Sequence, residues 1–378
     1  MNRSKLLYPI IALVSLGTLH SQSIDDLKLL FHEEHTAIYE CAASPVGKMV
    51  SFRTSAGDID KHFVYDFETD APSPVYAQDG GYMGDLVEKN TQNLIWSAVD
   101  AKSCLLKVVE DGKTTFAEVI ARGGGKVDFR PLLIELEEHQ LSTATFLSWN
   151  TQGKALLSLC ERKIPSGTDI PASSYDLYTL RTKTLKVSRL GSHPATRELH
   201  ASLFKKSEFI ISGVDNTGMN DLHQTNRRNE YTQLTDTPRL SESWPAVSPE
   251  NDFVVFANPH RKNVNTADLF IMPTSGGTPE ILATDIYIPA TSYSSSGIYQ
   301  WSKDGKKVVF ISYSPEKKSP LAVVDIKTKA VKIFDVDVIF PSSFAISGDE
   351  KHILIVGAGT SESNEQTSYK AFVGDYHH

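Results

Sequence analysis

Cysteine is scarce in this sequence of 378 residues, which contains only three. Cys41, Cys104 and Cys160 form no CxxC pair or other close spacing that is typical of a metal site. Each lies in an apolar, strand-like run, where cysteine behaves as a small buried hydrophobe. Their odd number gives no support to a disulfide framework, although a single pair stays open. The sequence therefore predicts neither a disulfide-rich nor a cysteine-ligated fold.

Long apolar runs are also missing, since no stretch reaches the roughly 20 residues that a membrane-spanning helix needs. The main apolar run, LLYPIIALVSLG, follows Arg3 and Lys5 and precedes Ser21 and Ser23. A charged start, a short apolar run and small residues near a cut are typical of a secretory signal peptide. We predict a signal peptide over residues 1–23, cleaved at Ser21 or Ser23, and a periplasmic or secreted chain. An uncleaved anchor or a buried strand is the alternative.

Positive charge is in short supply, with 38 Lys and Arg against 46 Asp and Glu and a net charge of −8. Nucleic acids and anionic lipids are bound through clustered Lys and Arg. The small basic groups at residues 227–228 and 260–262 are interpreted as solvated hairpin tips. We therefore expect no nucleic-acid partner and no membrane span, and we expect a monomer.

Sequence motifs of catalysis are absent as well. There is no G-x-S-x-G elbow for a nucleophile, no HExxH or H-x-H, and the glycines at 123–125 lack the spacing of a phosphate loop. The 12 histidines are scattered, and a trio such as His200, His223 and His260 could bind a metal only if the fold brought it together. The sequence predicts no catalytic residue, no metal ligand and no cofactor.

What the sequence does contain is a unit of four strand-like runs in residues 234–285. ESWPAVS, DFVVFAN, ADLFIMP and PEILAT are each bounded by Pro, Gly, Asn, Asp or Ser. Residues 248–251, Ser-Pro-Glu-Asn, predict a turn between the first two runs with Asn251 in the left-handed conformation. Gly276 and Gly277 predict a tight hairpin with positive φ.

The unit recurs roughly every 45–55 residues, which is typical of a propeller blade. Its first turn is expected at Gly47, Asn93, Gly153, Lys206, Asn251, Gly305 and Asp349. We therefore predict an all-β fold, a propeller of four-stranded antiparallel blades, with seven blades and six as the alternative, forming one domain over residues 24–378. The last copy is one strand short, and the segment LKLLFHEEH near the amino end is expected to supply that strand.

One segment departs from the period. In residues 126–143, Leu132, Leu133, Leu136 and Leu141 sit close to helical spacing. The segment is predicted to form either a short helix on one rim or a plain connecting loop.

The repeated unit resembles that of TolB-like β-propellers, which are related to the propeller domains of prolyl-oligopeptidase-type enzymes. The residues that carry the resemblance are Leu234, Thr235, Pro245, Val247, Ser248, Pro249, Asn251, Val254, Val255, Phe256, Asp268, Leu269, Phe270, Gly276, Gly277 and Leu282, with support from the copies at Trp149 and Trp301. The resemblance implies a periplasmic protein that docks a partner on the mouth of its channel, without the enzyme domain of the peptidases.

Candidate binding residues follow from the repeat, because the start of each innermost strand lines the mouth of a propeller channel. These candidates are Glu40, Glu198, Glu242, Trp244 and Tyr299, with Tyr293 nearby. A Trp among carboxylates suits a peptide, a sugar or a protein loop, although Trp244 could instead pack between blades, as we expect of Trp149 and Trp301. We predict a non-enzymatic module that binds a protein, peptide or glycan; the alternative is a divalent-metal-dependent polysaccharide lyase or hydrolase with its site in the channel.

Overall fold

The computed structural model describes residues 23–32, 36–56, 59–74, 94–98, 100–110, 113–123, 126–134, 144–149, 154–163, 172–195, 200–205, 208–214, 220–225, 231–263, 265–288, 298–313, 320–334, 336, 338, 341–358 and 369–377. These residues form strands and turns and contain no helix. The predicted signal peptide up to residue 22, Glu198 and Tyr293 lie outside them.

The described strands fall into seven four-stranded antiparallel sheets, which we number as blades 1 to 7. Blade 1 is β2 (Ala37–Ala43), β3 (Met49–Ala56), β4 (Ile59–Asp66) and β5 (Ala71–Pro74); blade 2 is β6 (Ile95–Trp96), β7 (Ser103–Glu110), β8 (Lys113–Gly123) and β9 (Lys126–Leu132); blade 3 is β10 (Ala144–Trp149), β11 (Lys154–Lys163), β12 (Ala172–Arg181) and β13 (Lys186–Ala195). Blade 4 is β14 (His200–Phe204), β15 (Glu208–Val214), β16 (Asn220–Thr225) and β17 (Tyr231–Gln233); blade 5 is β18 (Ser243–Val247), β19 (Phe253–Pro259), β20 (Thr266–Pro273) and β21 (Glu280–Tyr287). Blade 6 is β22 (Tyr299–Trp301), β23 (Lys307–Ile311), β24 (Leu321–Asp325) and β25 (Val331–Ile333); blade 7 is β26 (Ser343–Ile346), β27 (His352–Gly357), β28 (Lys370–His377) and β1 (Ser23–Phe31).

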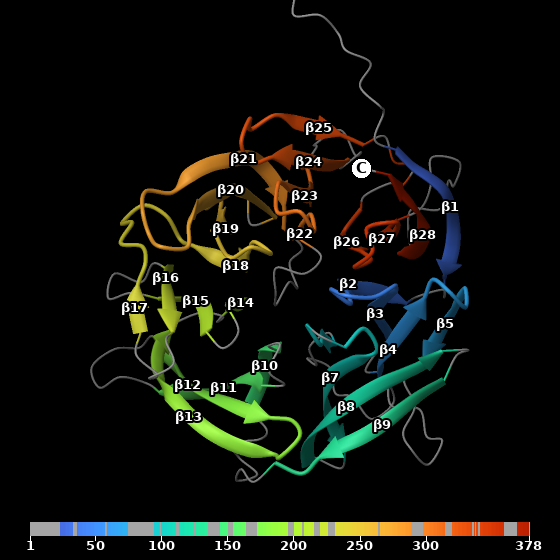
Figure 1. Ribbon diagram of the computed structural model, residues 1–378, viewed down its shortest axis with the longest axis horizontal. Coiled ribbons are helices and arrows are strands. Elements are labelled where there is room, and N and C mark those ends of the chain that lie inside the picture. The colour runs from blue at the N-terminus through green and yellow to red at the C-terminus, as the bar shows by residue number, and fades with distance from the viewer. Residues whose placement is uncertain are drawn as a thin grey trace, which may run out of the picture.

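The blades are arranged in a ring around a central channel (Figure 1), with the first strand of each blade innermost and the fourth on the outer rim. The fold is therefore an all-β, seven-bladed propeller. This confirms the predicted architecture and excludes the six-bladed alternative.

The ring closes through the amino-terminal strand. β1 is the outer strand of blade 7 and pairs antiparallel with β28, so that Ser23 lies opposite His377 and Leu29 opposite Phe372. This confirms that the segment near the amino end completes the last copy. Ile24, at the beginning of β1, is buried in the cluster between blades 6 and 7.

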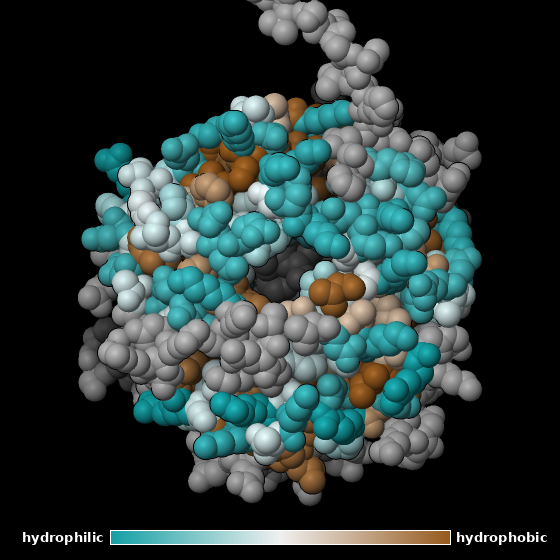
Figure 2. Space-filling view, viewed as in Figure 1, coloured by the Kyte–Doolittle hydropathy of each residue, from teal (hydrophilic) through white to brown (hydrophobic). Residues whose placement is uncertain are grey.

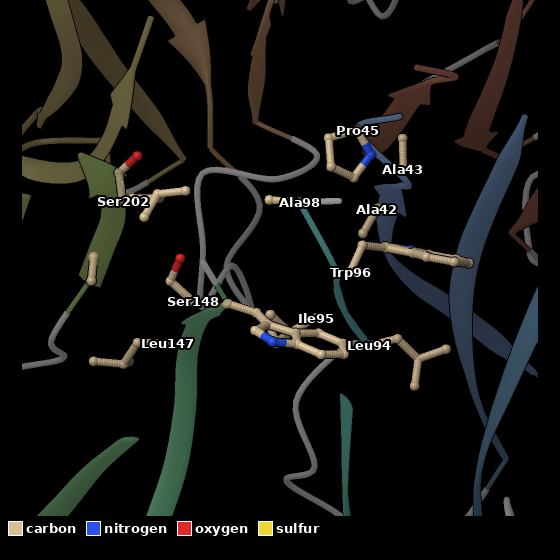
Figure 3. A pocket seen from close by; sticks show the side chains of 13 residues that line it. Ala42, Ala43, Pro45, Leu94, Ile95, Trp96, Ala98, Leu147, Ser148 and Ser202 are labelled. Atoms are coloured by element: carbon tan, nitrogen blue, oxygen red, sulfur yellow. The ribbon is translucent and has the colours of Figure 1, made fainter. Parts of the chain in front are cut away.

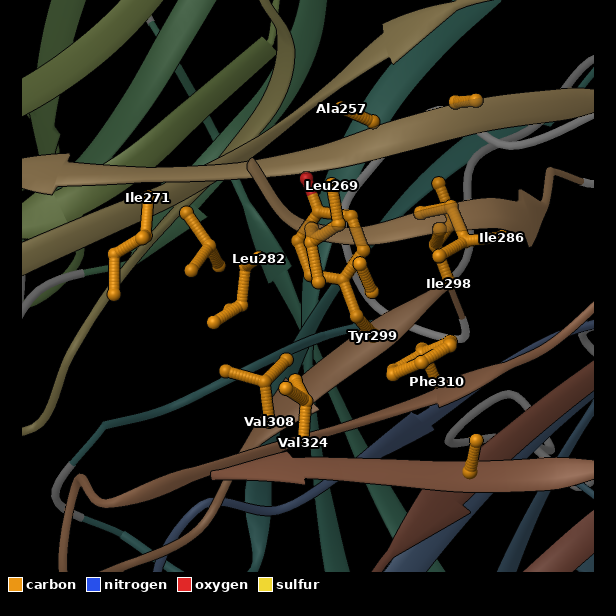
Figure 4. Packing of buried hydrophobic residues seen from close by; sticks show 14 of the residues in the cluster. Ala257, Leu269, Ile271, Leu282, Ile286, Ile298, Tyr299, Val308, Phe310 and Val324 are labelled. Carbon is orange, nitrogen blue, oxygen red and sulfur yellow. The ribbon is translucent and has the colours of Figure 1, made fainter. Parts of the chain in front are cut away.

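The core is distributed over the interfaces between blades. Each of the seven interfaces holds its own cluster of buried apolar side chains. At the interface of blades 5 and 6, Leu269 and Leu282 face Tyr299 and Val308 (Figure 4). Because both faces of a blade are covered, the middle strands are apolar on both sides, as in the run VVFA of β19, all of which is buried.

A serine at the end of the innermost strand organises the turn to the second strand. In blade 5 the backbone N–H of Asn251 donates to the carbonyl of Ser248 over 2.9 Å, and Asn251 has φ +63°. The Ser248 hydroxyl accepts from the N–H groups of Asp252 and Phe253. Gly276 and Gly277 have φ +92° and +142°. The predicted chemistry of both turns is confirmed.

These first turns also contact one another across blades. The N–H of Gly348 in blade 7 donates to the carbonyl of Gly47 in blade 1 over 2.8 Å. A Cβ on Gly348 would lie 2.6 Å from the carbonyl carbon and oxygen of Pro45, and one on Gly47 would lie 2.5 Å from the Cβ of Ala101 in blade 2. Both positions admit only glycine without a shift of neighbouring atoms, so the turns of blades 7, 1 and 2 are in direct contact.

The predicted position of the first turn in blade 2 is wrong. The innermost strand of this blade is the two-residue β6, and the first turn lies after Ser97 rather than at Asn93, which is outside the described residues. Ser97 and Asp100 build this turn: the N–H of Asp100 donates to the Ser97 hydroxyl, and Ser103 donates to the Asp100 carboxylate. Because side chains hold the turn, it needs no Gly or Pro, and the sequence signal for it is weak.

The predicted conformation of the segment from residue 126 is also wrong. Residues 126–132 form β9, the outer strand of blade 2, and not a helix or a loop. Leu132 is buried between blades 2 and 3. Leu133 is 74% exposed, and Leu136 and Leu141 lie outside the described residues. Pairing with β8 decides the conformation here, because it satisfies the backbone of a segment whose leucine spacing fits a helix.

Candidate functional site

The inner wall of blade 5 contains a strained aromatic residue. The pairing of β18 with β19 shifts register between Ser243 and Ala246, which is a β-bulge. Within the bulge, Trp244 has φ +52°, a value that is rare for a bulky residue. The Tyr299 hydroxyl of blade 6 donates to the Trp244 carbonyl, so the next blade holds the bulge in place.

The ring of Trp244 packs against a buried histidine of blade 4. The His200 and Trp244 rings lie 4.9 Å apart at their centroids, with a 43° angle between their planes. Burial lowers the pKa of His200 to about 3, because the charged imidazolium loses its hydration there. His200 is therefore neutral at physiological pH and acts as an apolar packing partner for Trp244, which stays half-buried.

A buried carboxyl group precedes the bulge. Glu242 has no exposed surface; its Oε1 accepts from the Thr237 hydroxyl, and its Oε2 has no hydrogen-bond partner among the described residues. Burial raises the pKa of Glu242 to about 7, and the nearby Asp221 carboxylate acts in the same direction. Near neutral pH this side chain changes between a neutral and a charged form at the junction of blades 4 and 5.

The predicted mouth residues that lie in the described part of the chain divide into three groups. Glu40 lies on β2, and its side chain is outside what the structure describes. Glu242 and Tyr299 are buried, so they support the Trp244 bulge from within and do not present a contact surface. Trp244 is the described candidate that keeps part of its side chain exposed, and its role in binding stays a prediction.

The three histidines of the possible metal trio each have separate surroundings. His200 packs on Trp244, the His223 Nδ1 lies 3.3 Å from the carbonyl of Asp221, and the His260 Nε2 lies 3.0 Å from the Asp268 carboxylate. Over the described ranges, no group of three or more His, Cys, Asp or Glu side chains is placed to hold a metal ion. Cys41 and Cys104 are buried, as expected of small hydrophobes, whereas the side chain of Cys160 lies outside the described part.

A cavity of about 300 Å³ opens in the channel wall of blades 1 to 4. Its described lining comes from the innermost strands β2, β6, β10 and β14 and from residues next to β2 and β6, and consists of Ala42, Ala43, Pro45, Leu94, Ile95, Trp96, Ala98, Leu147, Ser148, Trp149, Ala201, Ser202 and Leu203. Figure 3 shows Trp96 and Ala42 on one side of this space and Ser148 and Ser202 on the other. The channel is open at the face drawn in Figure 2, where an apolar group borders it on the side of β2.

Every described lining residue of the cavity is uncharged, and among them only Ser148, Ser202 and the two indoles carry polar side-chain atoms. Two of these are engaged: the Ser202 hydroxyl accepts from the backbone N–H of Val247, and the Trp96 indole N–H donates to the Ser51 hydroxyl, each over 3.0 Å. A small, mostly apolar, concave site with few polar groups is the usual form of a ligand pocket.

Two of the cavity residues belong to a repeated position. Trp96, Trp149 and Trp301 each end the innermost strand of their blade. The Trp301 indole N–H donates to the carbonyl of Ala246 in the preceding blade over 2.9 Å, and that of Trp96 donates to the Ser51 hydroxyl over 3.0 Å. The Nε1 of Trp149 is buried and has no hydrogen-bond partner among the described residues. The predicted packing of Trp149 and Trp301 between blades is confirmed.

Reasoning from the sequence missed this cavity because it assigned the binding surface to the starts of the innermost strands. The cavity lies along their later residues, next to the first turns. The recurring Trp before that turn was the available signal, but the sequence shows only that Trp is repeated. Which of these tryptophans has an indole N–H without an acceptor among the described residues depends on the neighbouring blade.

No protein-family model matches this chain, and no curated protein matches it in sequence. Among solved structures, an oligogalacturonate lyase in complex with manganese matches with a TM-score of 0.59 and 12% identity, over 95% of this chain and 99% of that one. The β-propeller domain of the Trilobed protease from Pyrococcus furiosus, described as having an open velcro topology, gives 0.52 and 15% over 78% and 83% of the two chains. TolB from Acinetobacter baumannii gives 0.47 and 12%, over 79% of each.

A peptidase propeller is among these neighbours, as the resemblance of the repeat implies. At such low identity the likeness is one of fold alone. The described residues also include no helix with the length and apolar character needed to span a bilayer.

Proposed function

We propose that this chain is an exported, non-enzymatic propeller that binds an extended segment of a partner protein in its central channel, as a TolB-like module. The observation that carries the proposal is the uncharged cavity in the channel wall. It is bordered by four innermost strands, each of which pairs with a neighbouring strand on one side only. Strand edges suit an extended peptide, because main-chain hydrogen bonds supply affinity and side-chain pockets supply specificity.

A glycan fits the cavity less well. A sugar ring stacks on an aromatic face that solvent can reach, whereas Trp96 and Trp149 are only 7% and 6% exposed. An uncharged, apolar lining also offers few partners for the hydroxyl groups of a sugar, and each hydroxyl buried without a partner would cost free energy. These properties favour a peptide ligand over a glycan.

Export and a periplasmic or secreted location are proposed from residues 1–23, whose charged start and apolar run are typical of a signal peptide. The acidic balance of the chain agrees with a protein partner and with the absence of a nucleic-acid partner. We propose that the chain acts as a monomer.

A selection of displayed random peptides on the purified chain tests the proposal, with Ala98→Phe as the counter-selection. Ala98 lines the cavity and is half-buried, so a phenyl ring there fills the space without replacing a core side chain. We expect the selected peptides to bind Ala98→Phe at least tenfold more weakly than the original chain. Equal binding to both, with both folded by circular dichroism and thermal melting, would contradict a channel site.

The alternative is a divalent-metal-dependent polysaccharide lyase or hydrolase. It is motivated by the likeness in fold to the manganese complex of oligogalacturonate lyase. The described residues do not fit that role, since they hold no cluster of three side chains that could bind a metal. Metal content measured by plasma mass spectrometry, with and without chelator, separates the two functions when it is combined with an assay on oligogalacturonate and Mn²⁺. Stoichiometric metal with turnover would replace the binding module by the lyase.

A further inference from the structure

We infer that the cavity anchors one uncharged apolar side chain of the bound segment, and that the Trp149 indole N–H donates a hydrogen bond to a main-chain carbonyl of that segment. The inference rests on the proposed function, because it names the chemistry that the channel site selects. It adds two points that the fold alone does not specify. The first is the binding residue Trp149, and the second is the class of ligand, a segment with an uncharged apolar side chain.

The indole of Trp149 is the first piece of evidence. Its Nε1 is buried and unpaired among the described residues, and Trp149 lines the cavity. Nearly all buried donors in folded proteins have an acceptor, because a buried N–H without one has lost its water and gained nothing. The atoms around Nε1 cover it in the unbound chain, so a carbonyl oxygen of the bound segment would supply the missing acceptor by displacing them.

The repeat supplies an internal comparison. In blade 6 the equivalent Trp301 reaches the Ala246 carbonyl of the preceding blade. In blade 2, Trp96 reaches the Ser51 hydroxyl, which itself donates to the Ala42 carbonyl over 3.5 Å. Both therefore direct their N–H to the innermost strand of the preceding blade, directly or through one hydroxyl. Blade 3 departs from this pattern at the place where the wall is hollowed.

The lining determines the ligand class. None of its described residues is ionisable, so a charged side chain would find no partner among them, which is strongly unfavourable for a buried charge. The volume of about 300 Å³ is at the lower end of the range for ligand pockets. It suits a single aliphatic side chain with its adjoining peptide group. The open edges of β2, β6, β10 and β14 favour an extended peptide over an unattached small molecule.

The direct test observes the indole N–H groups by nuclear magnetic resonance. The chain has four tryptophans, so a deuterated sample gives four indole signals, which Trp→Phe variants assign. N-acetyl-leucine N-methylamide is the probe, and N-acetyl-lysine N-methylamide is its charged counterpart. We expect the leucine probe to shift the Trp149 signal downfield in a saturable manner and to leave Trp301 unchanged, and we expect no shift with the lysine probe. No saturable shift of Trp149 would overturn the inference.

Matched variants separate this inference from the proposed function. Trp149→Phe keeps the ring in the interface and removes the N–H, and we expect it to weaken the selected peptides about tenfold. Trp301→Phe, the same change at the equivalent position of blade 6, should leave peptide binding unchanged. Peptides that Ala98→Phe blocks but Trp149→Phe does not would overturn the anchor and keep the channel site. If the leucine probe binds while no selected peptide does, the site takes small molecules, which overturns the peptide ligand.

Discussion

Blades 6 and 3 both have a tryptophan at the end of the innermost strand, but the two indole N–H groups have different surroundings. Trp301 and Trp149 both end an innermost strand and both insert between blades. The N–H of Trp301 is bonded to the preceding blade, whereas that of Trp149 has no acceptor among the described residues and borders a cavity. The repeat therefore fixes the position of the ring, and the neighbouring blade decides whether it closes the wall or lines a site.

The walls of blades 5 to 7 are joined by direct hydrogen bonds. The Gln300 side chain donates to the Ile346 carbonyl over 2.8 Å and accepts from the Ile346 N–H over 3.0 Å. Tyr299 holds the Trp244 bulge in the same region. We call blades 5, 6 and 7 the sealed side and blades 1 to 4, whose innermost strands border the cavity, the hollow side. The comparison suggests that stability is concentrated on the first and binding on the second.

The largest expected effect on the sealed side comes from Gly348→Ala. The added Cβ would lie 2.6 Å from the carbonyl atoms of Pro45 and 2.7 Å from the carbonyl oxygen of Ser44, and these backbone atoms cannot rotate away. We expect a loss of about 3 kcal/mol in the free energy of unfolding, measured by urea denaturation. Gly305→Ala is the control, because its nearest atom is 3.6 Å away and its cost comes only from φ +67°, about 1–2 kcal/mol. Equal losses of stability for Gly348→Ala and Gly305→Ala would show that the contact between the turns of blades 7 and 1 is not tight.

A second prediction concerns the pH dependence of stability at Glu242, a residue at the boundary between the sealed and the hollow side. The pKa of Glu242 is about 7 in the folded chain against an ordinary value of 4.5. The unfolded state therefore releases this proton first as the pH rises. The Glu242 contribution to stability falls between pH 4.5 and 7 by about 3 kcal/mol and is constant above that range.

Glu242→Gln removes this titration and keeps the shape of the side chain. We expect the variant to match the original chain near pH 4.5 and to exceed its free energy of unfolding by about 2–3 kcal/mol at pH 8. Urea denaturation at a series of pH values measures the difference. Parallel pH profiles for the two proteins would contradict a raised pKa at Glu242.

The smallest effect is the most direct test of the comparison itself. Trp301→Phe removes a bonded N–H and leaves the Ala246 carbonyl without its donor, which should cost about 1–2 kcal/mol. Trp149→Phe removes an N–H that has no acceptor among the described residues, so it should be close to neutral in stability. Thermal melts and urea curves of the two variants, in parallel, measure both. Equal destabilisation would mean that Trp149 is as well bonded as Trp301.

Most of the fold could be predicted from the sequence, because turn chemistry and strand patterns repeat. Asn251, Gly276 and Gly277 have the positive φ that their turns require. The prediction failed in blade 2, where Ser97 and Asp100 hold a turn without Gly or Pro. It also failed for residues 126–132, where sheet pairing overrides the spacing of leucines. In both places the deciding interactions come from other strands.

The candidate site was less predictable, because burial and acceptor geometry are properties of the assembled ring. Glu242 and Tyr299 were expected at an exposed mouth, and both are buried beneath the Trp244 bulge. Trp149 was expected between blades and is found there, but whether its N–H finds an acceptor among the described residues depends on how the neighbouring blade packs. A single sequence shows which residues repeat and does not show which contacts each copy makes.

The closure of the ring sets an order of events during synthesis. β1 leaves the ribosome before the strands of blades 1 to 6, and its partner β28 leaves after them, since Phe31 pairs with Ala371. At ordinary rates of synthesis the amino-terminal strand waits on the order of half a minute for its partner. Throughout that interval β1 is an unpaired edge with apolar residues, the kind of segment that chaperones bind and that joins neighbouring chains. Blade 7 is therefore completed only after the strands of the other six blades have been synthesised.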